Sequence, residues 1–236
     1  MATEQIDYIG QELDLFSHAA NWKRYFARQF APYVNGRVLE AGAGMGVNAS
    51  YLWNERVHEW TFLEPDARLL GQVPERVRHP ELRKARRING TTASLPPDER
   101  FDTILYLDVI EHIEDSKGEL RRAFDLLAPG GHLLILVPAF NYLYSPFDKA
   151  IGHFRRYDRS ILRAELPPEL IRVKTRYLDS LAFFLSLANK WFLTRSSPTL
   201  KQVLFWDRVI VPLSHFSDPL VLWSFGKSLI SVSRKP

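Results

Sequence analysis

Short apolar runs alternate with helix-like segments along most of the chain. Runs of about four to eight apolar residues between turn residues are typical of strands buried in a parallel sheet. The predicted strands are Arg37–Ala41, Glu59–Glu64, Leu82–Asn89, Phe101–Asp108, His132–Pro138, Ile171–Tyr177 and Lys227–Ser233. This alternation predicts an α/β fold, in which helices cover both faces of a parallel sheet.

Two helical regions accompany these strands. The segment Glu4–Tyr33 is predicted to form two helical pieces ahead of the sheet, ended by Pro32 and Gly36. An amphipathic helix is predicted to begin at Ser116 and to be stopped by Pro129–Gly131.

A third region, rich in Phe, Trp and Leu, separates the last two strands. Leu181–Leu193 and Gln202–Leu213 are predicted to form helices, and polar residues keep both well short of the about 20 apolar residues of a membrane span. This insertion could be a lid over an apolar ligand, a surface that rests on a bilayer, or part of the core. No site role is therefore assigned to Trp191, Phe192, Phe205 and Trp206.

A glycine-rich turn follows the first strand. Gly42, Gly44 and Gly46 leave bare backbone at the start of a helix, where a polar ligand can approach closely. A dinucleotide fingerprint would require glycine at position 47, which is Val47. Glycines at this spacing after an acidic residue, here Glu40, are typical of S-adenosylmethionine sites. The alternative is a turn that serves only strand–helix packing.

Carboxylates end the second and fourth strands. Glu64 can accept hydrogen bonds from both ribose hydroxyls of a nucleoside, whereas Asp66 fits the alternative role of a helix cap better. The fourth strand ends in Asp108, followed by Glu111 and His112. Open α/β sheets bind ligands at this carboxyl edge.

Four motifs in this order carry a family resemblance: Glu-x-Gly-x-Gly-x-Gly, Leu-Glu-Pro-Asp, Phe-Asp-x-x-x-x-x-Asp-Val-Ile-Glu-His and Leu-Ala-Pro-Gly-Gly. Together they resemble the class I S-adenosylmethionine-dependent methyltransferases, in the small-molecule and lipid-type branch that includes quinone-biosynthesis enzymes. The resemblance covers residues 35–180 and the last strand. It implies a Rossmann-like seven-stranded sheet, with six parallel strands and the last antiparallel, and S-adenosyl-L-methionine as cofactor.

The resemblance also implies a cofactor site. Gly42, Gly44 and Gly46 would lie along the methionine portion, with Glu40 beneath them; the other positions are Glu64 at the ribose, Pro65 on the adenine, Thr91, and Asp108 at the methionine end. Many relatives carry Gly-Asp-Ala where this chain has Gly90-Thr91-Thr92. The Thr91 hydroxyl can accept a hydrogen bond but carries no charge, which puts adenine recognition in doubt.

The predicted reaction is methyl transfer to a small or lipid-like acceptor, at oxygen. In-line displacement depends mostly on alignment and exclusion of water, and a base helps when the acceptor is a hydroxyl. His112 and His153 are the candidate bases; relatives carry a His-x-Arg-Arg-Tyr segment like that of His153 over the acceptor pocket. Each histidine also has a purely structural alternative.

Three alternatives accompany this prediction. Asp108, Glu111, His112 and His153 could form a divalent metal site, but the same string is common in metal-free relatives, so no metal is predicted. A nicotinamide-dependent oxidoreductase shares the strand, turn and acidic residue. A non-catalytic binding protein could keep the fold. The sequence does not predict the oligomeric state.

The resemblance divides a single methyltransferase domain, 1–236, into four parts: N-terminal helices at 1–35, a cofactor-binding core at 36–180, a helical insertion at 181–225 and the last strand at 226–236. With 46% hydrophobic and 25% charged residues, the composition is that of a globular domain. The absence of cysteine excludes disulfides and thiolate sites. With no secretory signal visible, we expect a cytoplasmic protein, with peripheral membrane contact open.

The formal net charge of +4 comes with two basic clusters. They are Arg83, Lys84, Arg86 and Arg87, and Arg155, Arg156, Arg159 and Arg163. A solvated basic face is the simplest interpretation, and attraction to an anionic substrate or membrane is the alternative. Nucleic-acid binding is disfavoured, because no binding module is recognisable and no aromatic residues interleave these clusters.

Overall fold

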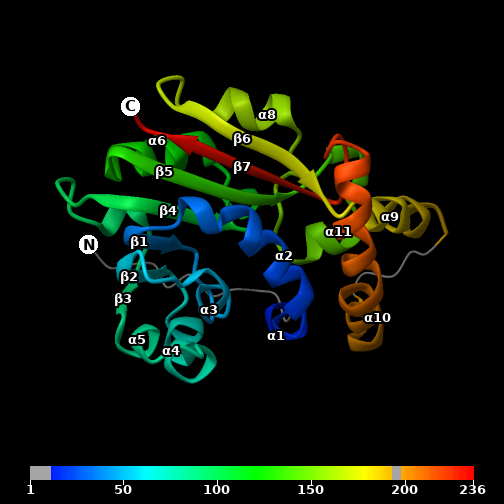
Figure 1. The fold of residues 1–236 in the computed structure, drawn as a ribbon, viewed down its shortest axis with the longest axis horizontal. Helices are drawn as coiled ribbons and strands as arrows, with labels where there is room; N and C mark the ends of the chain where they lie inside the picture. The colour runs from blue at the N-terminus through cyan, green and yellow to red at the C-terminus, as the bar shows by residue number, and fades with distance from the viewer. Residues whose placement is uncertain (1–11, 193–197) are drawn as a thin grey trace.

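A seven-stranded mixed sheet forms the centre of the protein, in a computed structural model that describes residues 12–192 and 198–236 (Figure 1). The strand order is β3-β2-β1-β4-β5-β7-β6. The strands are β1 (Gly36–Ala41), β2 (Val57–Glu64), β3 (Arg86–Asn89), β4 (Phe101–Leu107), β5 (Leu127–Pro138), β6 (Ile171–Leu178) and β7 (Ser228–Arg234). Because only β7 runs antiparallel to its neighbours β5 and β6, the prediction of six parallel strands and a last antiparallel one is confirmed.

Helices cover both faces of the sheet, as predicted (Figure 1). Successive residues of β4 point to opposite faces, so Ile104 packs with Leu120 of α6 while Leu105 packs with Phe30 of α2. The helices before the insertion are α1 (Glu12–Ser17), α2 (Ala20–Phe30), α3 (Ala49–Leu52), α4 (Ala67–Arg76), α5 (Pro80–Lys84), α6 (Ser116–Leu126), α7 (Pro146–Ala150) and α8 (Arg159–Glu165). Short 3₁₀ turns are η1 (Ala31–Tyr33), η2 (Thr92–Ser94), η3 (Ile110–His112) and η4 (Asn141–Leu143).

The predicted helical insertion lies between β6 and β7, beyond the carboxyl ends of the parallel strands (Figure 1). It consists of α9 (Ser180–Phe192), α10 (Leu200–Phe205), the π-helical turn η5 (Trp206–Ile210) and α11 (Val211–Leu220). Across the described ranges, every helix is too short or too polar to cross a membrane. Residues 4–11 of the first predicted helical region and Leu193 of the insertion lie outside the described residues.

Three predicted boundaries were wrong. Leu82–Lys84 belongs to α5 rather than to a strand, because Pro80 starts a helix whose Glu81 N–H is capped by His79 Nδ1 at 3.3 Å. Helix α6 ends at Leu126, before Pro129–Gly131, which lies within β5. Strand β4 stops before Asp108, whose φ of 56° turns the chain out of the sheet.

Candidate active site

A cavity of about 670 Å³ opens at the carboxyl ends of the parallel strands, the edge where the sequence predicts ligand binding. Its volume is in the range of cofactor and substrate sites. Of the predicted site residues, the cavity wall includes Gly42, Gly44, Glu64, Pro65, Thr91, Asp108, His112 and His153. Glu40 and Gly46 do not line it.

The glycine loop approaches the cavity as bare backbone. Gly42 has a φ of 65°, and a Cβ there would lie 2.6 Å from Val109 Cγ1. Gly46 has a φ of 71°, but its close neighbours are Val73 and Phe62, 3.0 and 3.1 Å from a built Cβ. Gly42 is therefore needed where the loop meets the end of β4, and Gly46 where the loop packs on α4 and β2.

Glu40 lies beneath this loop, inside the protein. Its Oε2 accepts a hydrogen bond of 3.2 Å from Trp60 Nε1, while its Oε1 has no partner among the described residues. Burial raises the pKa of Glu40 to about 8. Glu40 is thus neutral near pH 7 and supports the loop from below, at a distance from the cavity.

Glu64 holds the loop and its own strand end together. Its Oε2 accepts from the N–H of Gly44 at 2.8 Å, and its Oε1 accepts from the N–H of Asp66 at 2.9 Å. Burial raises the pKa of Glu64 against the effect of these two hydrogen bonds. Asp66 caps α4 through the N–H groups of Arg68 and Leu69, which is the capping role expected of it.

Pro65 and Thr91 lie together on the next part of the wall. The Asn89 side chain holds the Glu64–Pro65 backbone, because its Nδ2 donates to the carbonyl oxygens of Glu64 and Pro65 at 3.0 and 2.8 Å. The nearby Glu119 does not stand in for the missing carboxylate at position 91. Its oxygens already accept hydrogen bonds from Tyr106, Thr92 and Arg122.

Asp108 faces open space deep in the cavity. Removal from bulk water raises its pKa to about 6, and electrostatic interactions with His153, Lys227 and Lys23 oppose that rise. Lys23 of α2 is buried, which lowers its pKa to about 8, and its Nζ donates to the carbonyl of Phe16 at 2.5 Å. Burial also lowers the pKa of Lys227. Opposite charges therefore meet at the end of β4.

His153 is held by a buried ion pair. Its Nδ1 lies 2.9 Å from Asp148 Oδ1, and Arg156 grips both Asp148 oxygens at 2.8 Å through Nε and Nη2. Burial disfavours the Asp148 charge, but hydrogen bonds from His153, Arg156 and Ser145 outweigh it and hold the pKa of Asp148 below its usual range. An ionised Asp148 can only accept, so the His153 Nδ1 carries the proton and Nε2 is left to accept one.

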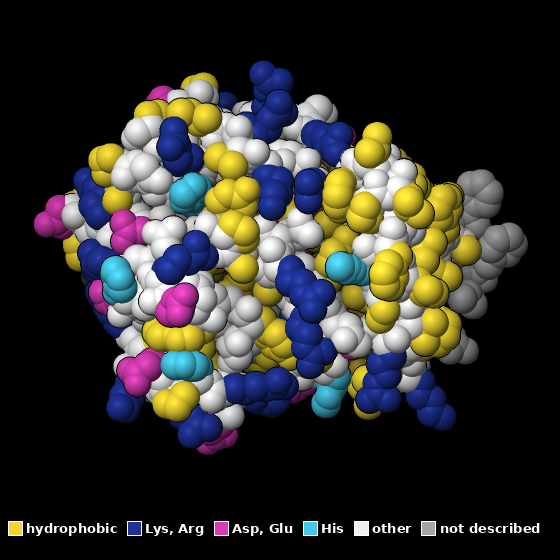
Figure 2. Space-filling view, in the orientation of Figure 1, with side chains coloured by type: hydrophobic (Ala, Val, Ile, Leu, Met, Phe, Trp, Pro, Cys, Tyr) yellow, Lys and Arg dark blue, Asp and Glu magenta, His cyan; other side chains and the backbone are white. Residues whose placement is uncertain are grey.

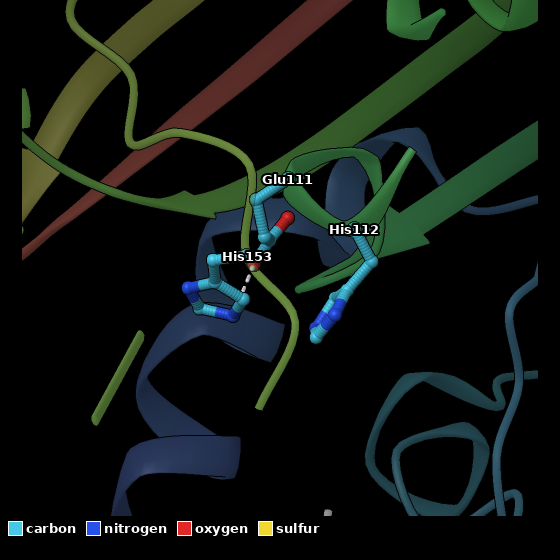
Figure 3. Close-up of side chains that lie close together, drawn as sticks. All are labelled: Glu111, His112 and His153. Atoms are coloured by element: carbon cyan, nitrogen blue, oxygen red, sulfur yellow. Dashed lines mark ion pairs between the residues drawn. The ribbon is translucent and has the colours of Figure 1, made fainter. Parts of the chain in front are cut away.

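His112 and Glu111 lie close to His153 (Figure 3). The rings of His112 and His153 meet edge to face, with 4.5 Å between centroids, and Glu111 Oε1 lies 3.9 Å from His153 Nε2. Burial and the neighbouring His153 lower the pKa of His112 to about 4, which makes it a poor base near pH 7. Burial raises the pKa of Glu111 well above its usual range.

Glu111, His112 and His153 could also hold a metal ion, since one ligand atom of each lies within 4.8 Å of the others. Histidine nitrogen with carboxylate oxygen is a donor set that suits first-row divalent metals. Asp108 is not part of this group. The expectation of a metal-free site stays a prediction.

Sequence reasoning missed several residues of the cavity wall: Lys23, Asp148, Arg156, Trp206 and Lys227. Arg156 was placed in a basic cluster interpreted as a solvated face; that interpretation is wrong for this residue, which is only 7% exposed. The feature of the sequence that could have predicted a site role for Arg156 is its position close to His153, in the Arg-Arg-Tyr segment. The side chains of Trp191 and Phe192, which received no site role, lie outside the described residues.

The fold and site define a class: an α/β domain with a glycine loop and a cavity at the carboxyl edge of its sheet. A family described as "Methyltransferase domain" matches residues 15–180. This chain belongs to that methyltransferase family, and the resemblance seen in its motifs is confirmed.

Curated relatives are similar over part of their length. The chain is 29% identical over 118 residues to a ubiquinone biosynthesis O-methyltransferase of Rhodopseudomonas palustris (strain TIE-1), covering 45% of this chain and 46% of the relative. It is 30% identical over 149 residues to a protein named as a probable S-adenosylmethionine-dependent methyltransferase of Mycolicibacterium smegmatis, covering 62% and 54%. The chain thus spans about half the length of these relatives.

A solved structure shares the fold along nearly the whole chain. The N-methyltransferase NodS from Bradyrhizobium japonicum, in complex with S-adenosyl-L-homocysteine, superposes with a TM-score of 0.60 at 14% identity. The superposition covers 99% of this chain and 95% of that one. This likeness supports the Rossmann-like methyltransferase fold.

Proposed function

We propose that the protein is an S-adenosylmethionine-dependent methyltransferase that acts on a small or lipid-like acceptor at oxygen. The observation that carries this proposal is the convergence of the glycine loop, Glu64 and Asp108 on one cavity. Family membership supports methyl transfer over the nicotinamide alternative. The R. palustris relative, which is named as an O-methyltransferase, supports oxygen as the acceptor atom.

The cavity wall fits the proposed cofactor part by part. Glu64 would accept hydrogen bonds from the ribose hydroxyls, with Pro65 and Thr91 beside the adenine. Asp108 would attract the ammonium group of the methionine end, and Lys23 places a positive charge near its carboxylate. Gly42 leaves room for the chain between these two ends.

When bound, S-adenosylmethionine supplies an activated methyl group, so the protein must mainly align the acceptor and remove its proton. His153 would take that proton at Nε2, because its Nδ1–H is committed to Asp148 at 2.9 Å. Asp148 and Arg156 are positioning residues: Asp148 fixes the ring through its Nδ1–H, and Arg156 holds the Asp148 carboxylate.

An aromatic part of the cavity wall suits an apolar acceptor. Phe16, Phe147 and Trp206 line this part, and the rings of Phe16 and Trp206 meet edge to face at 6.0 Å between centroids. Apolar walls with few polar groups are typical of pockets for small organic molecules. A phenol or hydroxyl-bearing lipid head would place its oxygen between this wall and His153.

Titration calorimetry with S-adenosylmethionine, S-adenosylhomocysteine and NADH tests the proposal, on the wild type, Glu64→Gln and Glu59→Gln. Glu59 lies on the same strand but is half-exposed and pairs with Arg37, so it is a matched control. We expect both adenosyl ligands to bind, NADH not to bind, and Glu64→Gln alone to weaken binding about tenfold or more, through loss of charge-assisted hydrogen bonds.

Binding of NADH in place of the adenosyl ligands would overturn the proposal in favour of an oxidoreductase. Binding of none of the three by a folded protein would favour a non-catalytic protein that keeps the fold. Once binding is established, transfer of a labelled methyl group to phenols and to amines of similar size separates oxygen from nitrogen as the acceptor atom.

A further inference from the structure

The helical insertion exposes a stripe of large apolar side chains on its outer side. Along α10, η5 and α11, the exposed side includes Phe205, Val209, Leu213, Phe216 and Leu220, spaced three or four residues apart. Phe216 is 76% exposed and Leu220 is 83% exposed. A surface helix in water normally buries such a stripe.

The buried side of the same helices combines two core valines, Val203 and Val211, with three polar residues. Asp207, Ser214 and Asp218 are almost inaccessible to solvent. Asp207 accepts from the N–H groups of Asn21 and Trp22 at 3.2 and 2.9 Å, so it caps the start of α2. These bonds fix the orientation of α11, because rotating the apolar stripe inward would leave buried charges without partners.

Asp218 makes the same kind of bonds to α9. Its oxygens accept from the N–H groups of Asp179 and Ser180 at 2.7 and 2.8 Å, and from the hydroxyl of Tyr25 at 2.7 Å. The exposed apolar stripe is therefore a stable part of the fold, which fits a surface that meets a non-aqueous partner.

Cations lie along one side and at the lower end of this stripe (Figure 2). The exposed charged residues of α2, α10, η5 and α11 are Arg24, Arg28, Lys201 and Arg208. Within the described part of these elements, the only acids are the buried Asp207 and Asp218. The neighbouring α1 directs Asp14 to Arg76, at 2.8 Å. An apolar face bordered by cations complements a surface that is apolar inside and anionic outside.

A second cavity lies at the edge of the stripe. It measures about 270 Å³, and its walls include Arg24, Arg28, His215 and Phe216. The His215 ring stacks on Tyr25 at 4.9 Å, and both of its nitrogens have no hydrogen-bond partner within the described ranges. A pocket with two arginines beside an exposed aromatic ring suits the phosphate group of a phospholipid, and the acyl chains of that lipid would contact the stripe.

We propose that this face, formed by α2, α10, η5 and α11, docks on a bilayer that contains anionic phospholipid. Phe205, Leu213, Phe216 and Leu220 enter the acyl boundary, while Arg24 and Arg28 bind headgroup phosphates. Two exposed arginines with four large apolar side chains supply both the electrostatic and the apolar contributions that interfacial binding requires.

The docking face is continuous with the wall of the active-site cavity. Trp206, in η5, lines that cavity, whereas its neighbour Phe205 is exposed on the stripe. Lys227 lies 4.5 Å from the Trp206 ring and lines the same cavity. A lipid-like acceptor would thus pass from the bilayer to the cavity along η5. This step rests on the proposed function, whereas the docking itself does not.

Co-sedimentation with sucrose-loaded vesicles tests the docking. Vesicles of pure phosphatidylcholine are compared with vesicles of phosphatidylcholine and phosphatidylglycerol at a ratio of about 7:3. We expect the protein to bind the anionic vesicles, and Phe216→Ser/Leu220→Ser and Arg24→Gln/Arg28→Gln each to lower the partition coefficient about tenfold or more. The matched controls are Ile171→Thr/Val173→Thr, exposed on β6, and Lys84→Gln/Arg87→Gln.

Unchanged thermal unfolding and S-adenosylhomocysteine binding identify folded variants. Absence of vesicle binding by a protein that binds S-adenosylhomocysteine overturns the docking and leaves the proposed function intact. Vesicle binding by a protein that does not bind S-adenosylhomocysteine would support the docking and overturn the proposed function. Equal loss in the control variants overturns the docking. Sedimentation velocity tests whether a second copy of the chain covers this face instead. If the protein self-associates, does not bind vesicles, and loses self-association in Phe216→Ser/Leu220→Ser, the face is a contact between two copies and the docking is overturned.

Discussion

Asp148 is the residue through which the chemistry of His153 is set. It joins His153 to Arg156 inside the protein, at 2.9 Å on one side and 2.8 Å on the other. A neutral amide at this position could present its NH₂ group to His153 and reverse the tautomer of the ring. The imidazole would also lose its hydrogen bond to a carboxylate.

Asp148→Asn is therefore expected to lower kcat about 10- to 100-fold, and His153→Asn by about 100-fold or more. The pH profile of kcat should move for Asp148→Asn, while the affinity for S-adenosylhomocysteine stays unchanged in both variants. A purely structural role would instead lower cofactor affinity and thermal stability without moving the pH profile.

Glu40 makes the stability of the fold depend on pH. Its pKa in the folded protein is about 8, whereas an unfolded chain has the ordinary value of 4.5. Between these values only the folded state holds the proton, so the free energy of unfolding falls as pH rises. The loss ends above pH 8, where both states are ionised.

Glu40→Gln should remove this loss, because the amide oxygen can still accept from Trp60 Nε1. Its stability advantage over the wild type should grow from pH 4.5 to pH 8, with a slope approaching ~1.4 kcal/mol per pH unit. Urea unfolding at several pH values measures it, with the exposed Glu59→Gln as control. A pH-independent difference would show that burial does not perturb Glu40.

At the level of elements, the β1–α3 turn is determined by backbone geometry. Gly42 and Gly130 share a left-handed backbone, with φ of 65° and 77°. They differ in their surroundings: a Cβ at Gly42 would clash with Val109, whereas nothing lies within 4 Å of one at Gly130. Comparing substitutions at the two glycines therefore distinguishes the effect of backbone strain, which both share, from the effect of a clash at the cavity wall, which only Gly42 has.

Gly42→Ala and Gly130→Ala should each lose about 1 kcal/mol of stability from the strained φ. Only Gly42→Ala should also weaken S-adenosylhomocysteine binding, by about tenfold or more, because the loop must move away from β4. Calorimetry and thermal unfolding measure both effects. Equal cofactor affinity in the two variants would contradict a role for the Gly42 backbone in the site.

At the level of the whole molecule, buried hydrogen bonds tie the insertion to the N-terminal helix α2. Asp218 of α11 bonds to Tyr25 of α2 and to the start of α9. Asp218→Asn should lower the free energy of unfolding by about 2 kcal/mol or more, because it leaves buried groups without partners. The exposed Asp98→Asn is the control. Scanning calorimetry should show one transition, and a separate transition for the insertion would contradict this coupling.

The sequence predicted the parts of the molecule that local patterns specify. Strand periodicity and glycine spacing placed the sheet and the loop, because buried strands and left-handed turns restrict residue types locally. Lys23, Trp206 and Lys227 escaped prediction, because segments far apart in the sequence bring them to the cavity only after packing. Pro80 shows the limit within one element, since its helix start overrode an apolar run read as strand.

The position of β7 has a consequence for how the chain is made. This strand follows all the others in the sequence, yet it lies between β5 and β6 and forms every hydrogen bond that joins β6 to the sheet. During synthesis, the facing edges of β5 and β6 therefore carry unsatisfied backbone groups until the last strand leaves the ribosome. That interval is when the chain most needs chaperones, and when another growing chain could take the empty place.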